Sequence, residues 1–450
     1  MPAGPRRDLT RIAKIGAALL LLIAPAFISF NYIFRFAVDV PYWDAWQFVP
    51  LLGEFYEGKL PLGLLTQQHN EHRIVLPRLL MLLLARLTDY DTSAEMYASW
   101  LMLCATVVVY FSVHTRAFGT YFSSVVAFAP IPWVVLTLRQ YENLLWGWQI
   151  QVVLAASLLV LTLFFIERSL AQPWRFVLAL LTAAGCTFSF GSGLVVWPTG
   201  VIQLLLLARR GMSAPRRNLV IGAWILGGTG CLALYFWGYQ APSGHPPFLR
   251  PFQDPLAFFV ALCAVLGNPF TGNATLAPII GAVILASLIA VLLLAVGGRL
   301  DWQKAPLAIP LITSSLFAAL LMVIGRGRFG IPELTISRYV TLVVPCFVGA
   351  HMATLAIADR RSRLFLGAAI AFLAGMAVFA SFDSTYPAGR ERRAIMLAYR
   401  RTLLDYRSVP DSDLTGLFID PLLVRKGADV LQTYRLSAFR SAPLPSRESR

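Results

Sequence analysis

The stretch from Val38 to Arg78 holds several residues that could take part in chemistry, beginning with Asp44 between Trp43 and Trp46. A carboxylate in this position can accept a proton from a hydroxyl group, as a general base does. The indole faces of Trp43 and Trp46 are suited to packing against the C–H face of a sugar ring. An aspartate before an apolar helix is also a common N-cap, so the sequence supports both a catalytic and a capping role.

Further along the same stretch, five polar residues stand in a row: His69, Asn70, Glu71, His72 and Arg73. On a helix, two histidines three positions apart would share a face, and with a carboxylate they could hold a divalent metal. The HxxH spacing is far less specific than HExxH, so we expect no metal and no other cofactor. We favour hydrogen bonding to a substrate, and a polar cap on the following helix is the alternative.

A second polar segment runs from Arg139 to Gln149 and contains Glu142, Asn143 and Trp146. Amide and carboxylate groups can hydrogen-bond to sugar hydroxyls, and an indole can pack on the sugar ring. The segment is therefore typical of a sugar-binding loop. A belt of aromatic rings at the membrane surface would explain the same residues.

A third segment, Gly325–Tyr339, contains Arg326, Arg328 and Arg338, the last followed directly by Tyr339. Arginine binds phosphate oxygens through two parallel hydrogen bonds. We therefore assign these four side chains to substrate binding, with a phosphate on a lipid-borne substrate as the ligand. Anchoring to lipid headgroups is the alternative.

The composition indicates the kind of fold that contains these three polar segments. The 450 residues are 57% hydrophobic and only 14% charged, whereas soluble domains carry roughly a quarter charged residues. The apolar runs are long and continuous, which excludes a β-barrel. We expect an all-α, polytopic transmembrane bundle. The net charge of +15 follows from basic cytoplasmic loops, so we expect no nucleic-acid partner.

The apolar runs predict about eleven spans, after which the bundle ends near residue 380. The predicted spans are 15–34, 97–113, 121–138, 149–166, 176–190, 194–207, 219–237, 277–296, 306–324, 339–357 and 364–380. Residues 36–96 form a first outer loop with interfacial helices, one of them within Tyr42–Gly58 and another over Leu76–Leu87. Residues 381–450 form a short basic tail, with a surface helix over Ala388–Tyr406.

The charges of the short loops predict the orientation. With a cytoplasmic N-terminus, alternate loops carry the arginines and lysines expected inside: Arg116, Arg168, Arg175, Arg209, Arg210, Arg216, Arg217, Arg299, Lys304, Arg360, Arg361 and Arg363. The three polar segments then all lie outside the cytoplasm. An odd number of spans places the tail outside as well.

This layout resembles the GT-C superfamily of membrane glycosyltransferases. An anchor helix precedes a first outer loop with an acid near its start, here Asp44. The entry HRIVLPR (72–78) and the late arginines Arg326 and Arg338 also resemble the family pattern. The resemblance implies a polyprenyl-phosphate-linked sugar donor, transfer on the outer face and usually inversion at the anomeric carbon. Many relatives carry two adjacent acids where this chain has Asp44-Ala45, so Glu71 or Glu142 is expected to supply the second.

We therefore expect an enzyme of the bacterial inner membrane that transfers a sugar from a polyprenyl-phosphate donor to a lipid or glycan acceptor, with an extracytoplasmic active site. A lipid-linked glycan polymerase or ligase would share the donor and depend more on the arginines. A transporter or flippase of polyprenyl-linked glycans would place polar residues at the middle of the membrane. Here they gather in the outer loops instead.

Overall fold

The computed structural model describes residues 5–209, 212–241 and 250–441. Its elements are helical, apart from two isolated β-bridges, His69–His72 and Leu300–Ile357. The α-helices are α1 (Pro5–Phe36), α2 (Val49–Tyr56), α3 (Leu62–Thr66), α4 (Val75–Thr88), α5 (Thr92–Phe118), α6 (Phe122–Phe128), α7 (Pro130–Val135), α8 (Tyr141–Leu145), α9 (Ile150–Arg168), α10 (Arg175–Thr187), α11 (Val196–Ala208), α12 (Ala214–Phe236), α13 (Pro255–Gly267), α14 (Leu276–Val296), α15 (Ala308–Arg326), α16 (Ile331–Leu334), α17 (Val340–Leu355), α18 (Arg360–Ala380), α19 (Tyr386–Leu404), α20 (Asp411–Leu414) and α21 (Pro421–Thr433). Short 3-10 turns include η1 (Trp43–Gln47), η2 (Leu138–Gln140), η3 (Gly147–Gln149), η4 (Gly191–Val195), η6 (Asn268–Phe270), η7 (Gly327–Phe329), η8 (Ser337–Tyr339) and η10 (Ser437–Ser441).

The predicted polytopic helical bundle is confirmed. Across the described ranges, ten helices are long and apolar enough to cross a membrane. Two segments differ from the prediction. The span expected at 176–190 is the shorter helix α10, which at about 1.5 Å per residue is well below the roughly 30 Å hydrocarbon thickness. The apolar helix α13 was not expected at all.

Helix α13 packs closely against α14 because small residues let their backbones touch. A Cβ atom added to Gly281 would lie only 1.7 Å from the carbonyl oxygen of Cys263. A side chain at this position would therefore push the two helices apart. The turn η6 joins them and brings Asn268 toward the polar segments.

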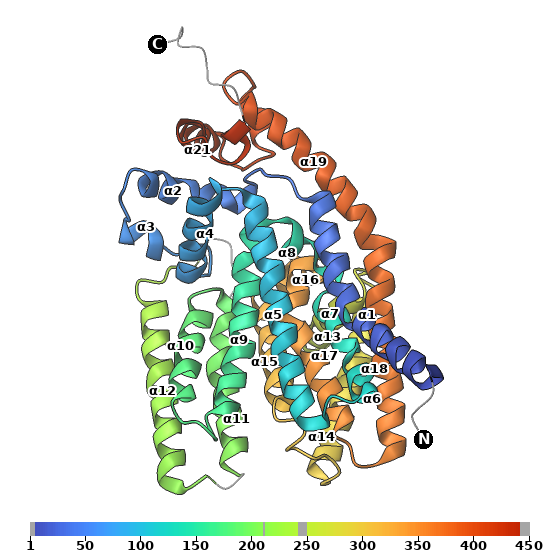
Figure 1. Ribbon diagram of the computed structural model, residues 1–450. Helices are drawn as coiled ribbons and strands as arrows, with labels where there is room; N and C mark the ends of the chain where they lie inside the picture. Colours follow the sequence, from blue (N-terminus) through green and yellow to red (C-terminus); the bar gives the residue numbers. More distant parts are fainter. Residues whose placement is uncertain (1–4, 210–211, 242–249, 442–450) are drawn as a thin grey trace.

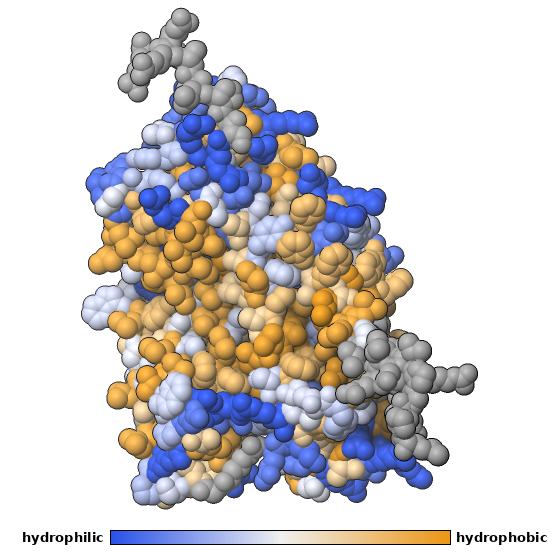
Figure 2. All heavy atoms as spheres, in the orientation of Figure 1, coloured by the Kyte–Doolittle hydropathy of each residue, from blue (hydrophilic) through white to orange (hydrophobic). Residues whose placement is uncertain are grey.

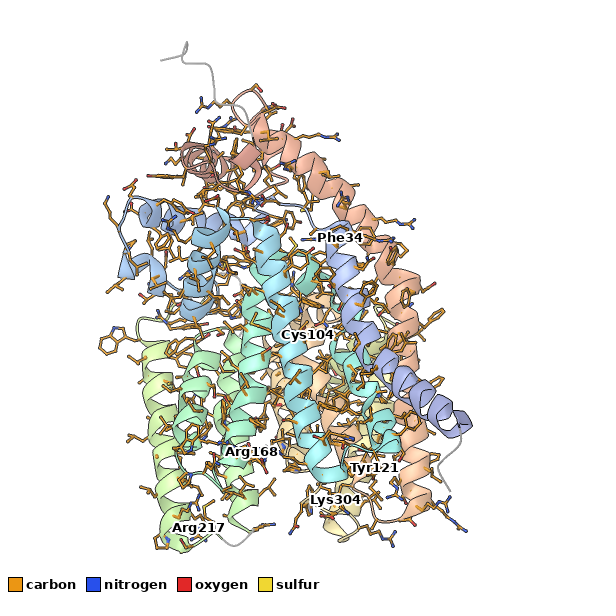
Figure 3. All side chains as sticks on the ribbon, viewed as in Figure 1. Phe34, Cys104, Tyr121, Arg168, Arg217 and Lys304 are labelled. Atoms are coloured by element: carbon orange, nitrogen blue, oxygen red, sulfur yellow. The ribbon has the colours of Figure 1, made fainter. Side chains whose placement is uncertain are left out.

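The bundle has an apolar middle and two polar ends. Figure 2 shows a hydrophobic band around the middle, with hydrophilic residues gathered above and below it. Tyr121, Arg168, Arg217 and Lys304 lie toward the lower end, whereas Phe34 lies toward the upper end (Figure 3). The basic loops that the charge pattern grouped together are thus represented at one end of the molecule.

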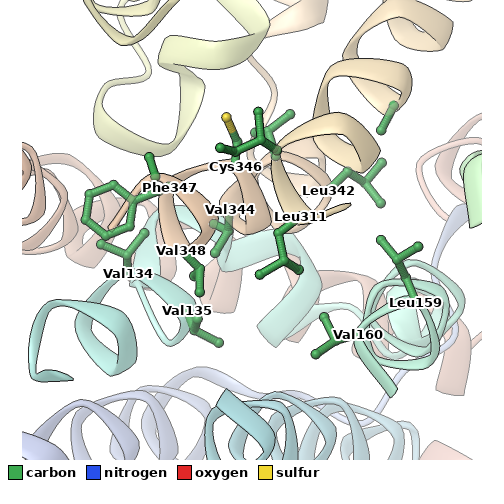
Figure 4. Close-up of a cluster of buried hydrophobic side chains, with 14 of the residues drawn as sticks. Val134, Val135, Leu159, Val160, Leu311, Leu342, Val344, Cys346, Phe347 and Val348 are labelled. Carbon is green, nitrogen blue, oxygen red and sulfur yellow. The ribbon is translucent and has the colours of Figure 1, made fainter. Parts of the chain in front are cut away.

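The core of the bundle lies where α7, α9, α15 and α17 meet. Val134, Leu159, Leu311 and Phe347 are among the buried apolar side chains of this cluster (Figure 4). Close packing of these branched and aromatic side chains holds the four helices in fixed positions relative to one another. The site described below is built on the upper ends of these helices.

A second hydrophobic cluster joins the first loop to the C-terminal segment. Trp46, Leu52 and Ile74 of the loop are buried together with Val424 and Leu431 of α21. Figure 1 shows α21 beside α2 and α4 at the upper end of the bundle. The C-terminal segment, residues 381–441, therefore does not extend away from the molecule, and its helix α21 covers the first loop.

Three local expectations are corrected. The helix expected within Tyr42–Gly58 is divided into η1 and α2. The surface helix expected over Ala388–Tyr406 is α19, which continues α18 through a π turn at Ser381–Thr385 (Figure 1). The third concerns His69 and His72, which do not lie on a helix: each backbone N–H donates to the other residue's carbonyl at 2.8 Å. Asn70 adopts a φ of 47° within this turn, and asparagine tolerates this left-handed region better than most residues.

Candidate active site

A cavity of about 750 Å³ lies between the first loop and the upper ends of the bundle helices. Most of the residues singled out in the sequence line it, although they come from segments far apart in the chain. These are Trp43, Asp44, His69, Asn70, Glu71, His72, Glu142, Trp146, Gln149, Arg326, Arg338 and Tyr339. The three polar segments of the sequence thus converge on one space.

Asp44 forms a pair with His69 at one side of the cavity. Asp44 Oδ2 lies 3.4 Å from His69 Nε2. The Nδ1 atom of His69 lies 2.9 Å from Gln47 Oε1 and Asn70 Nδ2 lies 3.3 Å from Nε2. Since an amide oxygen only accepts, this network places the proton on Nδ1 of the neutral ring and leaves Nε2 able to accept one. Asp44 therefore faces a group to which it can pass a proton.

Glu71, His72 and Arg326 form a second polar group. Arg326 Nη2 donates to Glu71 Oε1 at 2.6 Å, and His72 Nε2 lies 3.6 Å from the same oxygen. The N–H of Gly191 donates to His72 Nδ1 at 3.1 Å, so the neutral ring carries its proton on Nε2, toward Glu71. A Cβ atom on Gly191 would lie 2.6 Å from that nitrogen, which only glycine avoids.

Burial and neighbouring charges shift the pKa values of Glu71 and His72. Burial raises the pKa of Glu71, but His72 when it is protonated and the guanidinium of Arg326 outweigh this effect and hold the pKa below its usual value. Burial lowers the pKa of His72 to about 4, although Glu71 opposes this shift. At neutral pH we therefore treat Glu71 as ionised and His72 as neutral.

Glu142 is held by the last polar segment. Its Oε2 accepts from Ser337 Oγ at 2.6 Å and from the Arg338 backbone N–H at 3.2 Å, and its Oε1 lies 3.5 Å from Arg338 Nη1. Arg338 also pairs with Glu333 at 3.4 Å. Glu142 thus orients Arg338 at the cavity wall.

Four of the predicted substrate-binding residues do not line the cavity. Trp46 is fully buried in the cluster beneath α21. Arg73 donates to the carbonyls of Thr66, Tyr235 and Trp237 and so ties the first loop to α12. Asn143 donates to Arg338 O and Thr341 Oγ1 at 2.9 and 2.7 Å, and Arg328 packs over the ring of Phe329 at 4.4 Å. These four side chains therefore pack against or hydrogen-bond to other parts of the protein and do not face the cavity.

Other residues that line the cavity were not singled out in the sequence: Tyr42, Gln151, Tyr235, Tyr239 and Arg392. Tyr235 and Tyr239 lie at and just beyond the end of α12, where aromatic rings are ordinary, and Tyr42 lies in the first loop beside Trp43. Arg392 lies among many arginines of the C-terminal segment, so its sequence neighbourhood gave no signal. Gln151 lies two residues from Gln149, and this spacing within an apolar run was the one local signal available.

One wall of the cavity is apolar. Leu321, Met322 and Ile324 of α15 and Leu342 of α17 line it beside Arg326 and Arg338. Leu321 is also 39% exposed. An apolar surface thus lies beside the two arginines within the cavity.

The C-terminal segment holds the Asp44 loop in place. Trp43 adopts a φ of 48°, which is unfavourable for a large side chain. Its backbone N–H donates to the carbonyl of Leu417 at 2.8 Å. Arg440 Nη2 lies 2.8 Å from Asp39 Oδ2 and 2.9 Å from Asp91 Oδ2. The loop conformation is therefore maintained by contacts with the segment that covers it.

The acidic and histidine side chains of the cavity are engaged with protein groups. Within the part of the chain that the structure describes, no three His, Cys, Asp or Glu side chains form a group able to hold a metal ion. Asp44 and Glu71 face His69 and Arg326 instead.

Comparisons with known proteins give two similar structures. One is the crystal structure of ArnT from Cupriavidus metallidurans bound to undecaprenyl phosphate, with 14% identity, a TM-score of 0.44, and coverage of 94% of this chain and 76% of that one. The other is the crystal structure of the Archaeoglobus fulgidus oligosaccharyltransferase in complex with zinc and sulfate, with 12% identity, a TM-score of 0.40, and coverage of 87% and 56%. Both are GT-C membrane glycosyltransferases, the superfamily that the sequence resembles. At such identities the likeness concerns the fold alone. No protein-family model and no curated protein matches the sequence.

Proposed function

We propose that this protein is a membrane glycosyltransferase that moves a sugar from a polyprenyl-phosphate donor to a lipid or glycan acceptor. The observation that carries the proposal is the convergence of Asp44, Arg326 and Arg338 on one cavity with an apolar wall. The arginines suit the donor phosphate, and the apolar wall suits the polyprenyl chain. Trp43, Trp146 and the tyrosines offer ring faces for the sugar.

The proposed reaction is a displacement at the anomeric carbon of the sugar. Asp44 takes the proton of the acceptor hydroxyl, and His69 Nε2, at 3.4 Å, can receive it next. The acceptor oxygen forms a bond to the anomeric carbon as the bond from that carbon to the phosphate oxygen breaks. The polyprenyl phosphate leaves with the electron pair, and Arg326 and Arg338 stabilise its charge. Glu71 and Glu142 hold these arginines in place.

The reaction is proposed to take place outside the cytoplasm. Arg168, Arg217 and Lys304 lie toward the end opposite the first loop (Figure 3), and short cytoplasmic loops carry an excess of basic residues. This supports an extracytoplasmic cavity and C-terminal segment. We propose the inner membrane of a bacterium as the location. Residues 442–450 of that segment lie outside the described residues.

The test is transfer by the purified full chain with a panel of radiolabelled polyprenyl-phosphate hexoses and pentoses. Asp44→Asn should lower transfer by about 10²–10⁴-fold, the usual contribution of a general base, and should leave donor binding intact. Glu57→Gln is the matched control, because Glu57 lies on the same loop and pairs with Lys59 at the surface. Full activity of Asp44→Asn would remove this residue as the base.

Two other outcomes would change the assignment. Loss of transfer in Arg338→Ala but not in Asp44→Asn would favour a glycan polymerase or ligase. Movement of a labelled lipid-linked glycan across the membrane without sugar transfer would favour a flippase. Either result would overturn the proposed mechanism while retaining a polyprenyl-linked substrate.

A further inference from the structure

The long helix formed by α18 and α19 brings a third arginine, Arg392, to the cavity. Its guanidinium lies over the ring of Tyr42 at 5.1 Å and near the ring of Trp146 at 5.8 Å. Its Nε donates to the carbonyl of Leu145 at 3.3 Å. Both rings belong to residues that also line the cavity, so Arg392 is held between aromatic faces.

Arg392 differs from the other two arginines of the cavity in its pairing. Arg326 pairs with Glu71 at 2.6 Å, and Arg338 lies within 4 Å of both Glu142 and Glu333. Within the described ranges, Arg392 has no ion pair, and its Nη2 atom is buried without a hydrogen-bond partner. Glu142 also lines the cavity, but both of its carboxylate oxygens already face Ser337 and Arg338.

A buried guanidinium donor without a partner is unfavourable unless a ligand supplies the acceptor. Tyr42 also stacks on Tyr399 at 5.9 Å, so the aromatic cage is itself supported by α19. The fork of an arginine fixed in this way matches the geometry of a phosphate group. Arg326 and Arg338 would have to exchange a bound carboxylate for an incoming anion. Arg392 can bind an anion without breaking an ion pair.

We propose that Arg392 is a substrate-binding residue that recognises a phosphate group inside the cavity. This inference rests on the proposed function. The phosphate is carried either by the donor lipid, which Arg392 would then share with Arg326 and Arg338, or by the acceptor. The C-terminal segment thereby contributes a side chain to substrate recognition in addition to covering the loop.

The experiment measures binding and needs no turnover. The purified full chain in nanodiscs is titrated with polyprenyl phosphate, and then with inorganic phosphate after saturation with polyprenyl phosphate. Arg392→Gln should weaken at least one of these titrations by about tenfold or more. Arg401→Gln is the matched control, because it removes the same charge from an exposed position of the same helix.

The two titrations distinguish the sources of the phosphate. Weaker binding of polyprenyl phosphate assigns Arg392 to the donor, and weakening only of the second titration assigns it to the acceptor. Affinities that match those of Arg401→Gln in both titrations overturn the inference. If Arg392→Gln does not fold, Arg392→Lys decides: it keeps the charge but loses the fork, so severalfold weakening supports the proposal and unchanged affinity overturns it. A wild-type chain that binds the lipid phosphate but transfers no sugar would refute the proposed function and still test Arg392.

Discussion

Replacing Leu431 by alanine tests whether the C-terminal segment positions the Asp44 loop. Leu431 is fully buried in the cluster that joins α21 to Trp46 and Leu52. Its truncation should weaken this docking without touching the cavity. The consequence should reach Trp43, because its strained backbone is held by the carbonyl of Leu417 in the same segment.

The expected magnitude follows from the burial. Truncating a fully buried leucine to alanine costs about 2–5 kcal/mol, depending on how far the cavity collapses. A loss of about 3 kcal/mol lowers the ratio of docked to undocked segment by roughly a hundredfold. Leu422→Ala on the same helix is the control, since Leu422 is 58% exposed and such surface changes cost about 0.5 kcal/mol or less.

The assay is hydrogen exchange of the full chain in detergent, followed at the Trp43 amide and over residues 411–436. Leu431→Ala should speed exchange at both places and lower sugar transfer, while exchange in α9 and α17 stays as in the control. Rapid exchange over 411–436 with a fully protected Trp43 amide would show that the loop holds its conformation by itself. Equal exchange in the two variants would refute the docking argument altogether.

Three further predictions concern the cavity. Arg338→Ala should raise the donor concentration needed for half-maximal transfer, because it removes a cation from the phosphate position; an unchanged requirement would make Arg338 structural. His72 has a folded pKa of about 4 against an unfolded value of about 6.5, so the unfolded chain binds the proton first. Stability should therefore fall by about 3 kcal/mol as pH drops from 6.5 to 4, and thermal unfolding of His72→Gln should show a flatter pH profile; identical profiles would contradict this. Gly191→Ala places a Cβ atom 2.6 Å from His72 Nδ1 and should reduce transfer severalfold, whereas Gly222→Ala, with no atom within 4 Å, should not; equal activities would show that His72 can move without consequence.

The pattern of apolar residues predicted some helices and buried side chains wrongly, and the packing explains why. α10 was expected to span because its residues are apolar, but thirteen residues form only a short helix. α13 was missed because its apolar run is just as short, and it is placed by packing against other helices, including a close contact with α14. Trp46 and Trp43 are chemically alike in the sequence, yet one is fully buried and the other is 41% exposed. A residue type by itself does not indicate which face of a loop another segment will cover.

The sequence alone determined the class of protein and the places where its polar groups are concentrated. Backbone groups in lipid must be paired within one segment, so long apolar runs require helices whatever their partners, and local clusters such as residues 69–73 are visible without any fold. The tertiary structure decided which of these groups meet. The pair Glu71–Arg326 spans 255 positions and the pair Glu142–Arg338 spans 196, and Arg392 reaches the cavity because α18 continues into α19. Such meetings depend on the rotation and register of packed helices, which follow from contacts among distant residues and leave no signal in any local stretch of the chain.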